Sequence, residues 1–392
     1  MTLPLSRRAA LHWLGAAATA SALLPARLAL AAPSRSQDPQ GPRLVVVLLR
    51  GALDGLAAVP AYGDAAWSAL RGDADAAAAK GVPVPAALRL DATFGLHPSL
   101  AHLHAWYGQN ELLVVHATAS PYRERSHFDA QQLLESGGDK PFALNTGWLG
   151  RALQTAGQPA IALAAAMPLA LRGADGASTW TPDRRQDTDQ DLMARVSQMY
   201  RDDPQLAAAL AQAMGQQDMT MGADGGAGFA GLAKQAGSFL ADPKGPRVAW
   251  LEAGGWDTHT NQSARLTRLL TGLDEGLAAL RAGLGAHWAH TTVLVMTEFG
   301  RSATYNGTGG TDHGTGGVAF LAGGNVAGGR VLADWPGLAK GQLLEGRDLK
   351  PTMDLRNVIA PVVQHQFALS TAQLQSIVLP GVAKPTLNVW RT

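Results

Sequence analysis

Residues Leu44–Gly55 read LVVVLLRGALDG, and this stretch decides the fold class. Its first six residues are apolar without alternation, which is the pattern of a strand covered on both faces, as in a parallel sheet. Polar residues follow at once, beginning with Arg50 and ending with Asp54 and Gly55. A buried strand that runs into a polar, glycine-containing loop is typical of the ligand-binding edge of an open α/β sheet.

Five further apolar runs have the same unbroken character, and each predicts a buried strand. They are Leu112–Val115, Ile161–Ala165, Val248–Leu251, Val293–Met296 and Val318–Leu321. Helical patterns lie between them. Ser263–Leu284 repeats leucine at three- and four-residue steps with charges on the opposite face, and Asp129–Ser136 and Arg151–Thr155 predict short helices. Strands that alternate with helices predict an α/β domain with right-handed crossovers.

The composition excludes several classes of function. The chain has 392 residues, of which 46% are hydrophobic, and its formal net charge is +1. This balance gives no reason to expect nucleic acid or an anionic membrane surface as a partner. The sequence has no cysteine, which rules out disulfides, thiolate catalysis, Cys-ligated zinc and iron–sulfur clusters. A cofactor therefore has to be held by His, Asp, Glu, hydroxyl groups or backbone.

The first residues follow the three-part pattern of an export signal. Ser6-Arg7-Arg8 precedes the apolar stretch Ala9–Leu24, and Ala29-Leu30-Ala31 fits a cleavage site. The arginine pair indicates the twin-arginine route, and the Ala-rich, weakly hydrophobic stretch and Ser6 favour it over a general secretory signal in which the pair arose by chance. The apolar stretch is short for a bilayer and is followed by Pro25, so we expect no stable membrane insertion. We predict a signal peptide over residues 1–31, the twin-arginine translocation machinery as a partner, and a periplasmic or secreted protein.

Residues 32–42 are rich in Pro, Ser and Gln and predict a linker, and residues 43–392 predict a single domain. Two stretches, at about 66–92 and 173–246, interrupt the alternation of strands and helices. We expect the second of them to cover the site or to be mobile. Gly226–Gly231 matches G-x-G-x-x-G, but no strand precedes it, as a dinucleotide-binding loop requires.

Polar residues gather directly after four predicted strands, namely after LVVVLL, LLVV, VAWL and VLVM. In an open parallel sheet, ligands bind outside the carboxyl ends of the strands, so these residues are expected to converge on one crevice. The glycine-flanked segment Gly309–Gly317 adds an Asp-His pair. The resulting metal-ligand candidates are Asp54, Asp257, His259, Glu298, Asp312 and His313.

Carboxylates combined with imidazoles suit zinc, manganese or iron better than magnesium or calcium, and we expect a divalent metal, zinc or manganese first. Each candidate taken alone has a structural alternative, because an Asp after a strand is usually a turn or cap residue. Asp257 and His259 could cap the following helix, for example. Asp354 is predicted to cap a helix instead of serving the site.

Ser126 is the best candidate for a nucleophile. It stands just ahead of a predicted helix, where backbone N–H groups and the helix dipole favour an anion. Arg123 and Arg125 could hold phosphate or sulfate oxygens by paired hydrogen bonds, and His127 and Arg301 are further candidates for binding the substrate. The structural alternative is that Ser126 is only the N-cap of that helix.

At these residues the chain resembles a bacterial family of exported proteins classed as domain of unknown function 1501, from about residue 43 to the C-terminus. The stretches that carry the resemblance are Val47–Leu56, Leu96–Pro98, Arg125–Phe128, Gly255–His259, Thr297–Arg301 and Gly310–Gly314. The family resembles, more distantly, the alkaline phosphatase and sulfatase superfamily. That likeness implies a three-layer α/β/α sandwich with a mostly parallel central sheet and a two-metal site.

The superfamily likeness also implies roles for individual residues. It implies metal ligands at Asp54, Asp257, His259, Glu298 and His313, and a hydroxyl nucleophile at Ser126. Two departures put one metal position in doubt. Glu298-Phe299 stands where the superfamily has an Asp-His pair, and the spacing from Asp257 to His259 is shorter than in the phosphatases.

Three functions remain open from the sequence. The first is an exported metal-dependent hydrolase of phosphate or sulfate esters, whose ligand is an anionic ester. The second is a non-catalytic exported binding or assembly factor on the same scaffold, for instance one that acts on a surface polymer. The third is a redox protein that is loaded before export, although no recognised cofactor motif supports it.

Overall fold

The computed structural model describes residues 41–72, 86–182 and 228–391, all of which belong to the compact unit Asp38–Thr392. The predicted signal peptide, most of the linker, and large parts of both predicted interruptions lie outside the described residues. Among the helices that the structure describes, none has the length and apolar character needed to cross a membrane.

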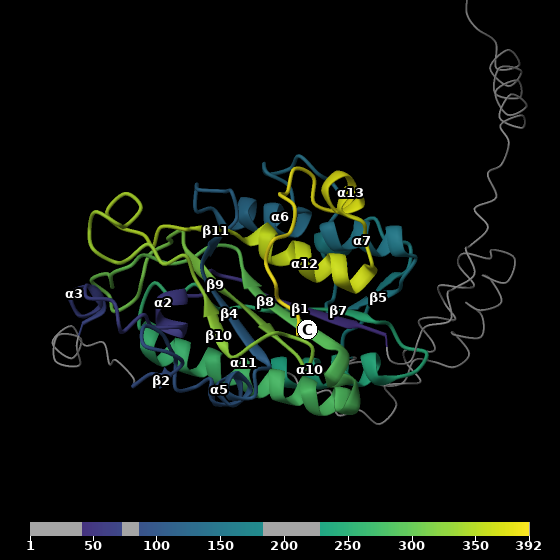
Figure 1. Ribbon diagram of the computed structural model, residues 1–392, viewed down its shortest axis with the longest axis horizontal. Coiled ribbons are helices and arrows are strands. Elements are labelled where there is room, and N and C mark those ends of the chain that lie inside the picture. The colour runs from purple at the N-terminus through teal and green to yellow at the C-terminus, as the bar shows by residue number, and fades with distance from the viewer. Residues whose placement is uncertain (1–40, 73–85, 183–227, 392) are drawn as a thin grey trace, which may run out of the picture. The chain divides into compact units, whose positions relative to one another are not determined.

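A sheet of nine strands forms the centre of the described chain, in the order β10-β4-β9-β8-β1-β7-β5-β6, with β11 paired to β4 (Figure 1). The strands are β1 Arg43–Leu49, β4 Leu112–Ala119, β5 Ala160–Ala162, β6 Ala177–Thr179, β7 Val248–Ala253, β8 Thr291–Thr297, β9 Gly317–Ala322, β10 Arg330–Leu332 and β11 Met353–Asp354. Each of the six apolar runs forms a strand, as predicted. Within this sheet every strand pair is parallel except those of β9, which runs antiparallel to β4 and β8.

Helices cover both faces of the sheet, which confirms the three-layer α/β/α sandwich. One layer contains α5 Ala101–Gly108, α10 Phe229–Ala241 and α11 Gln262–Leu284, and the other contains α6 His127–Ser136, α7 Trp148–Ala156 and α12 Leu355–Phe367 (Figure 1). The smaller elements are α2 Gly55–Ala58, α3 Trp67–Arg71, β2 Leu88–Arg89, β3 Gly95–Leu96, α13 Thr371–Gln373, the 3₁₀ turns Leu169–Leu171 and Gly285–His290, and the π turn Leu374–Val378. The predicted cap Asp354 begins α12, and its side chain accepts a hydrogen bond from the Arg356 amide.

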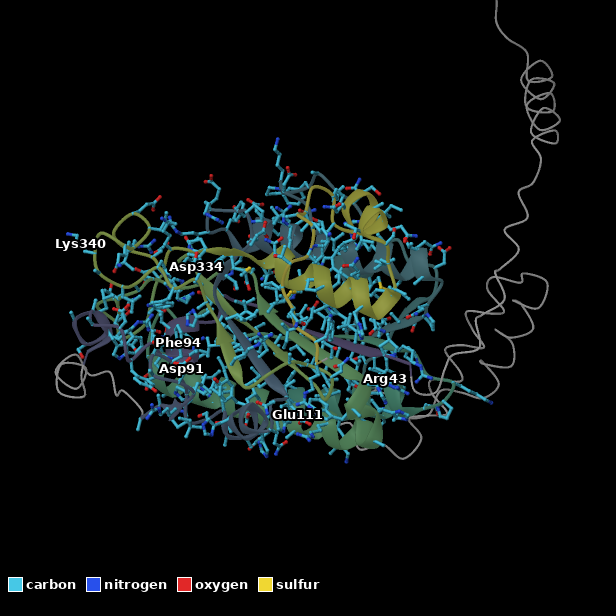
Figure 2. The ribbon with its side chains drawn as sticks, viewed as in Figure 1. Arg43, Asp91, Phe94, Glu111, Asp334 and Lys340 are labelled. Carbon is cyan, nitrogen blue, oxygen red and sulfur yellow. The ribbon has the colours of Figure 1, made fainter. Side chains whose placement is uncertain are left out.

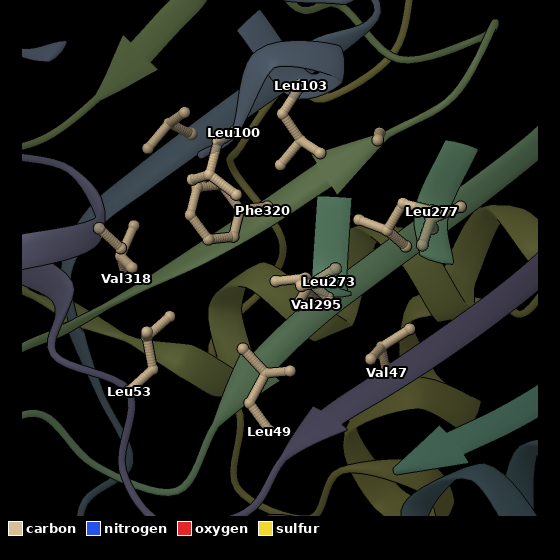
Figure 3. Close-up of a cluster of buried hydrophobic side chains, with 14 of the residues drawn as sticks. Val47, Leu49, Leu53, Leu100, Leu103, Leu273, Leu277, Val295, Val318 and Phe320 are labelled. Carbon is tan, nitrogen blue, oxygen red and sulfur yellow. The ribbon is translucent and has the colours of Figure 1, made fainter. Parts of the chain in front are cut away.

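The unbroken apolar run of β1 reflects its position in the middle of the sheet. Val45, Val47 and Leu49 belong to the core under α10 and α11, while the alternate residues Leu44, Val46 and Leu48 belong to the core under α7 and α12. Figure 3 shows Val47 and Leu49 in the first of these cores, with Leu273 and Leu277 of α11 close by. Because both faces of this strand are buried, no position suits a polar side chain, and polar and apolar residues do not alternate along it.

Both described ends of the stretch 173–246 belong to the sandwich. β6 extends the sheet at its edge, and α10 packs along α11 with Ala233, Ala236 and Phe239 fully buried. The structure therefore gives these ends a place in the core, and the part that could cover the site lies outside the described residues.

The directions of the strands bring the site residues to one edge. β1, β7 and β8 are parallel neighbours, and β4 runs the same way because both β4 and β8 are antiparallel to β9. Since β9 starts where those strands end, the loop before it also lies at this edge. Arg43, the first residue of β1, marks the opposite end of the strands from Asp334 and Lys340 (Figure 2).

Candidate metal centre

Four side chains from three separate segments meet at the carboxyl edge of the sheet. His127 is the first residue of α6, Asp257 and His259 follow β7, and His313 precedes β9. The His313 Nε2 atom lies 3.0 Å from the Nε2 atoms of both His127 and His259, and 3.2 Å from Asp257 Oδ1. His259 Nε2 lies 2.9 Å from the same Asp257 oxygen. The candidate ligands Asp257, His259 and His313 are therefore brought together as predicted.

Each of the three imidazoles has its other nitrogen next to a hydrogen-bond acceptor. His127 Nδ1 lies 2.8 Å from Glu298 Oε1, His313 Nδ1 lies 3.1 Å from the Arg125 carbonyl, and His259 Nδ1 lies 3.4 Å from Asp312 Oδ1. A neutral imidazole that donates from Nδ1 presents an unprotonated Nε2, which is the arrangement of histidines that ligate metals.

This donor set fits a divalent metal ion. Two neutral imidazoles gain nothing by pointing unprotonated nitrogens at each other at 3.0 Å, unless a proton or a cation lies between them. Ligand atoms at about 2.1 Å from a tetrahedral ion lie roughly 3.3–3.4 Å from one another, close to the observed separations. Three nitrogens and one carboxylate oxygen suit zinc, manganese or iron.

Two glycines let neighbouring loops close around Asp257 and His259. A Cβ atom at Gly51 would lie 2.6 Å from the Asp257 amide nitrogen, and one at Gly310 would lie 2.2 Å from the His259 carbonyl carbon. Gly51 also has a φ of +116°, which side chains rarely tolerate. The glycines beside the polar residues in the sequence are thus explained by close backbone contacts at the site.

Glu298 was predicted as a metal ligand, but it lies behind His127. It is fully buried at the end of β8, and its Oε1 atom accepts hydrogen bonds from His127 Nδ1, from the Gly51 amide at 2.7 Å and from Gln131 Nε2 at 2.9 Å. Burial acts to raise the pKa of Glu298, but these hydrogen bonds outweigh it and lower the pKa. The ionised carboxylate in turn raises the pKa of His127. Glu298 therefore orients the ring of His127, and its Oε1 atom is occupied by hydrogen bonds.

A Glu298→Gln variant is expected to weaken metal binding by about 10- to 100-fold, the usual cost of losing an outer-shell partner. The amide carries no charge, so its oxygen accepts the hydrogen bond from His127 Nδ1 more weakly than the carboxylate does. Metal affinity is measured by competition with a chromogenic chelator. Glu275→Gln, on the exposed side of α11, is the matched control and should leave the affinity unchanged. Wild-type affinity in Glu298→Gln would show that the carboxylate does not support the site.

Asp312 and Arg301 also occupy supporting positions. Asp312, a predicted ligand, faces His259 Nδ1 and accepts a hydrogen bond from Asn306 Nδ2 at 3.1 Å. Arg301, a predicted substrate-binding residue, is 1% exposed and donates from its guanidinium to Asp257 Oδ1. Burial acts to raise the pKa of Asp257, but the Arg301 hydrogen bond and charge lower it. Because Arg301 offsets the charge of Asp257, a cation at the centre would keep most of its positive charge for an anionic ligand.

Asp54 is not part of the cluster, which corrects the prediction that it ligates a metal. Its two oxygens pair with Arg71 at 2.7 and 3.0 Å, and it accepts a further hydrogen bond from Gln262 Nε2 at 2.6 Å. It also caps α2 through the Ala57 amide. Asp54 is 1% exposed and Arg71 2%, so this is a buried ion pair with no free lone pair directed at the site.

The residues before α6 were predicted to supply the nucleophile and the groups that bind the anion. Ser126 is at the N-cap position of α6, but its side chain makes no capping hydrogen bond. The guanidinium of Arg125 pairs with Asp348 and Glu345, and that of Arg123 donates to carbonyls of its own loop. The two arginines predicted to bind an anion are therefore held elsewhere, whereas Ser126 directly precedes His127 of the cluster.

The sequence predicted His127 as a substrate-binding residue, and the structure places it in one cluster with Asp257 and His313. It is the first residue of α6, which starts at the carboxyl edge of the sheet, and its Nε2 atom lies 3.6 Å from Asp257 Oδ2. The stretch Arg125–Phe128 was recognised in the sequence as part of the site, but its main role was assigned to Ser126. Of the six predicted ligands, the structure places Asp257, His259 and His313 in one cluster, together with His127.

A family model described as "Protein of unknown function (DUF1501)" matches residues 42–378. No curated protein sequence matches the chain. Among solved structures, a putative sulfatase from Bacteroides thetaiotaomicron is 10% identical with a TM-score of 0.42, and the alignment covers 88% of this chain and 76% of that one.

Two further solved structures are similar. The C-terminal periplasmic domain of EcEptC from Escherichia coli, in complex with Zn, is 11% identical with a TM-score of 0.37, covering 72% of this chain and 73% of that one. A phosphonate monoester hydrolase of Agrobacterium radiobacter is 11% identical with a TM-score of 0.36, covering 84% and 74%. At these values the likeness concerns the layout of strands and helices and says nothing about the reaction.

Proposed function

The chain belongs to the DUF1501 family, and we propose that it is a metal-dependent hydrolase of phosphate or sulfate esters. The observation that carries the proposal is the convergence of three Nε2 atoms and Asp257 while each Nδ1 faces an acceptor. A proton or a metal ion between these nitrogens would remove their repulsion, and the Asp257 carboxylate beside them supports the metal ion.

His127, Asp257, His259 and His313 would hold the ion, with zinc or manganese the best match to nitrogen and carboxylate donors. When bound, a divalent ion supplies charge that stabilises an ester oxygen as it becomes negative. The protein supplies the orientation. Glu298 fixes the ring of His127, and Arg301 fixes the carboxylate of Asp257.

We assign the attacking oxygen to Ser126. The amide groups at the start of the ten-residue helix α6 favour an anion beside the Ser126 hydroxyl. The Ser126 oxygen forms a bond to phosphorus or sulfur while the bond to the leaving alcohol breaks. The serine proton is released to solvent, and the departing alkoxide takes up a proton. Water then hydrolyses the seryl ester and restores the hydroxyl.

Export by the twin-arginine route belongs to the same proposal. It is supported by Arg7 and Arg8 and by the small-residue stretch that follows, all within residues 1–31. A periplasmic or secreted protein would meet anionic esters and surface polymers, the two kinds of ligand that the sequence left open.

The test uses protein purified without chelator, elemental analysis, and an aryl phosphate and an aryl sulfate as substrates. We expect about one zinc or manganese ion per chain and hydrolysis of at least one ester. Ser126→Ala should lower kcat at least about 100-fold while leaving the metal in place. Ser238→Ala, at an exposed position of α10, is the control and should keep full activity.

Full hydrolysis by Ser126→Ala would contradict the assignment of the nucleophile. A metal-loaded wild-type protein that hydrolyses neither ester would instead favour the second function, a non-catalytic exported binding factor. One observation favours that alternative: Arg123 and Arg125, the predicted anion-binding residues, are held by other partners.

A further inference from the structure

A buried carboxylate links the two chain segments that carry His127 and His313. Asp348 is 0% exposed, and its Oδ2 atom accepts hydrogen bonds from Arg125 Nε at 3.0 Å and from Thr315 Oγ1 at 2.9 Å. Arg125 lies two residues before His127 in the sequence. Thr315 lies two residues after His313. A single oxygen atom therefore ties together the two segments whose imidazole Nε2 atoms meet 3.0 Å apart.

Arg125 also contacts His313 directly, through its backbone. Its carbonyl oxygen lies 3.1 Å from His313 Nδ1. The φ of Arg125 is +59°, in the left-handed region, which costs free energy for a residue other than glycine and persists only where the surrounding structure fixes it. Two contacts hold this conformation, one from the guanidinium to Asp348 and one from the carbonyl to His313. The orientation of the His313 ring therefore depends on where the guanidinium of Arg125 is held.

The chain neighbours of Asp348 attach it to the loop that carries His313. Arg347 Nη2 donates a hydrogen bond to the His313 carbonyl at 2.8 Å. The Gly316 amide donates to the Leu349 carbonyl at 3.0 Å. A Cβ atom at Gly316 would lie 2.5 Å from that carbonyl oxygen, so the two backbones pack without room for a side chain. Asp348 is therefore fixed relative to His313, as a residue that sets the spacing of ligands has to be.

We propose that Asp348 is a positioning residue of the metal centre, which sets the distance between His127 and His313. It does so by holding Arg125 and Thr315 on one oxygen atom. The ligands of a tetrahedral ion stand at a defined separation, so an error in this distance weakens metal binding. The inference rests on the proposed metal site, and it gives Arg125 a role that differs from the anion binding predicted from the sequence.

Asp348→Asn keeps the shape of the side chain but removes its charge, and so weakens the hydrogen bond from Arg125. We expect its affinity for zinc, measured on the full chain by competition with a chromogenic chelator, to fall about 10-fold or more. Cobalt(II) gives the second readout, because its visible absorption bands report the geometry of its ligands. A folded Asp348→Asn protein should show shifted or weaker bands than wild type, which a loss of stability alone would not produce.

Variants of Arg125 and of its second partner show which contact matters. Glu345→Gln is the matched control, because it removes the other carboxylate that pairs with Arg125, one whose side chain is 65% exposed. It should change the affinity for zinc by less than about twofold. Arg125→Lys keeps a charged donor and should retain more affinity than Arg125→Gln, which keeps no charge.

The double variant Arg125→Gln, Asp348→Asn leaves no buried charge unpaired, and it tests the inference if Asp348→Asn does not fold. It should also bind zinc about 10-fold or more weakly than wild type. Wild-type affinity and a wild-type cobalt spectrum in either folded Asp348 variant would overturn this inference alone. A wild-type protein that binds neither zinc nor cobalt would overturn the metal site as well, so the two failures can be told apart.

Discussion

Alanine in place of His313 is expected to remove the bound metal and, with it, the hydrolysis of aryl phosphate or sulfate. His313 is the ligand in contact with all the others, since its Nε2 atom lies 3.0 Å from those of His127 and His259 and 3.2 Å from Asp257 Oδ1. Outer-shell partners cost 10- to 100-fold in metal affinity or activity, so losing a direct ligand at this position should cost more than about 100-fold in both.

Two measurements check the result, the metal content after gel filtration and kcat/KM for the better ester. His290→Ala, at an exposed position just before β8, removes an imidazole away from the cluster and should retain both metal and activity. Metal at wild-type content in a folded His313→Ala protein would show that the cluster is not a metal site. Circular dichroism establishes that the variant is folded.

Asp54→Ala is expected to destabilise the protein by about 3–5 kcal/mol, the usual cost of leaving one charge of a buried pair unpaired. Arg71 is 2% exposed and loses its paired hydrogen bonds to both Asp54 oxygens. Gln262 and the first turn of α2 lose an acceptor as well. The measurement is the free energy of unfolding in urea, and Asp139→Ala, at an exposed position, is the control.

Replacing both Asp54 and Arg71 tests whether the unpaired buried charge causes this loss of stability. The double variant Asp54→Leu, Arg71→Met leaves no buried charge and should recover most of the lost stability. A folded Asp54→Ala protein should also bind metal normally, because Asp54 lies outside the cluster. Loss of metal without loss of stability would restore the original prediction that Asp54 is a ligand.

The ion pair of Asp54 and Arg71 makes the stability of the protein depend on pH. Burial acts to raise the pKa of Asp54, but the charge and hydrogen bonds of Arg71 outweigh it, so the pKa is lowered. A lowered pKa in the folded state means that the carboxylate contributes stability above its unfolded pKa of about 3.9 and loses it as the pH falls further. The decline in wild-type stability below about pH 4 should therefore be smaller in Asp54→Ala.

The sheet was predictable from the sequence because strands buried on both faces leave unbroken apolar runs. β1 and β8 are the clearest examples, with every residue buried. The helix α12 was not predicted beyond its cap Asp354. It contains Pro361, and buried residues surround most of its circumference, so it has no polar stripe to mark its period. The antiparallel direction of β9 depends on tertiary pairing and leaves no mark in a short apolar run.

For the site, the sequence located the ligand-bearing loops but not the direction of each side chain. Asp257 and His259 were found because they follow a buried strand closely. Asp54 and Glu298 follow strands in the same way, yet one faces Arg71 and the other faces His127. Which partner a carboxylate meets depends on chain segments far away in sequence, such as α6 for Glu298. No single-sequence pattern records that choice.

The pairing of β1 has a consequence for the making of the protein. Leu44 at the start of β1 pairs with Val248 on one side and Thr292 on the other, so both neighbours of this strand are translated long after it. A nascent chain therefore carries LVVVLL without a partner until most of the polypeptide has emerged from the ribosome. During that time the exposed segment is prone to aggregate with other chains, because it is apolar and favours β-structure. Chaperones that bind such stretches should therefore raise the yield of native protein.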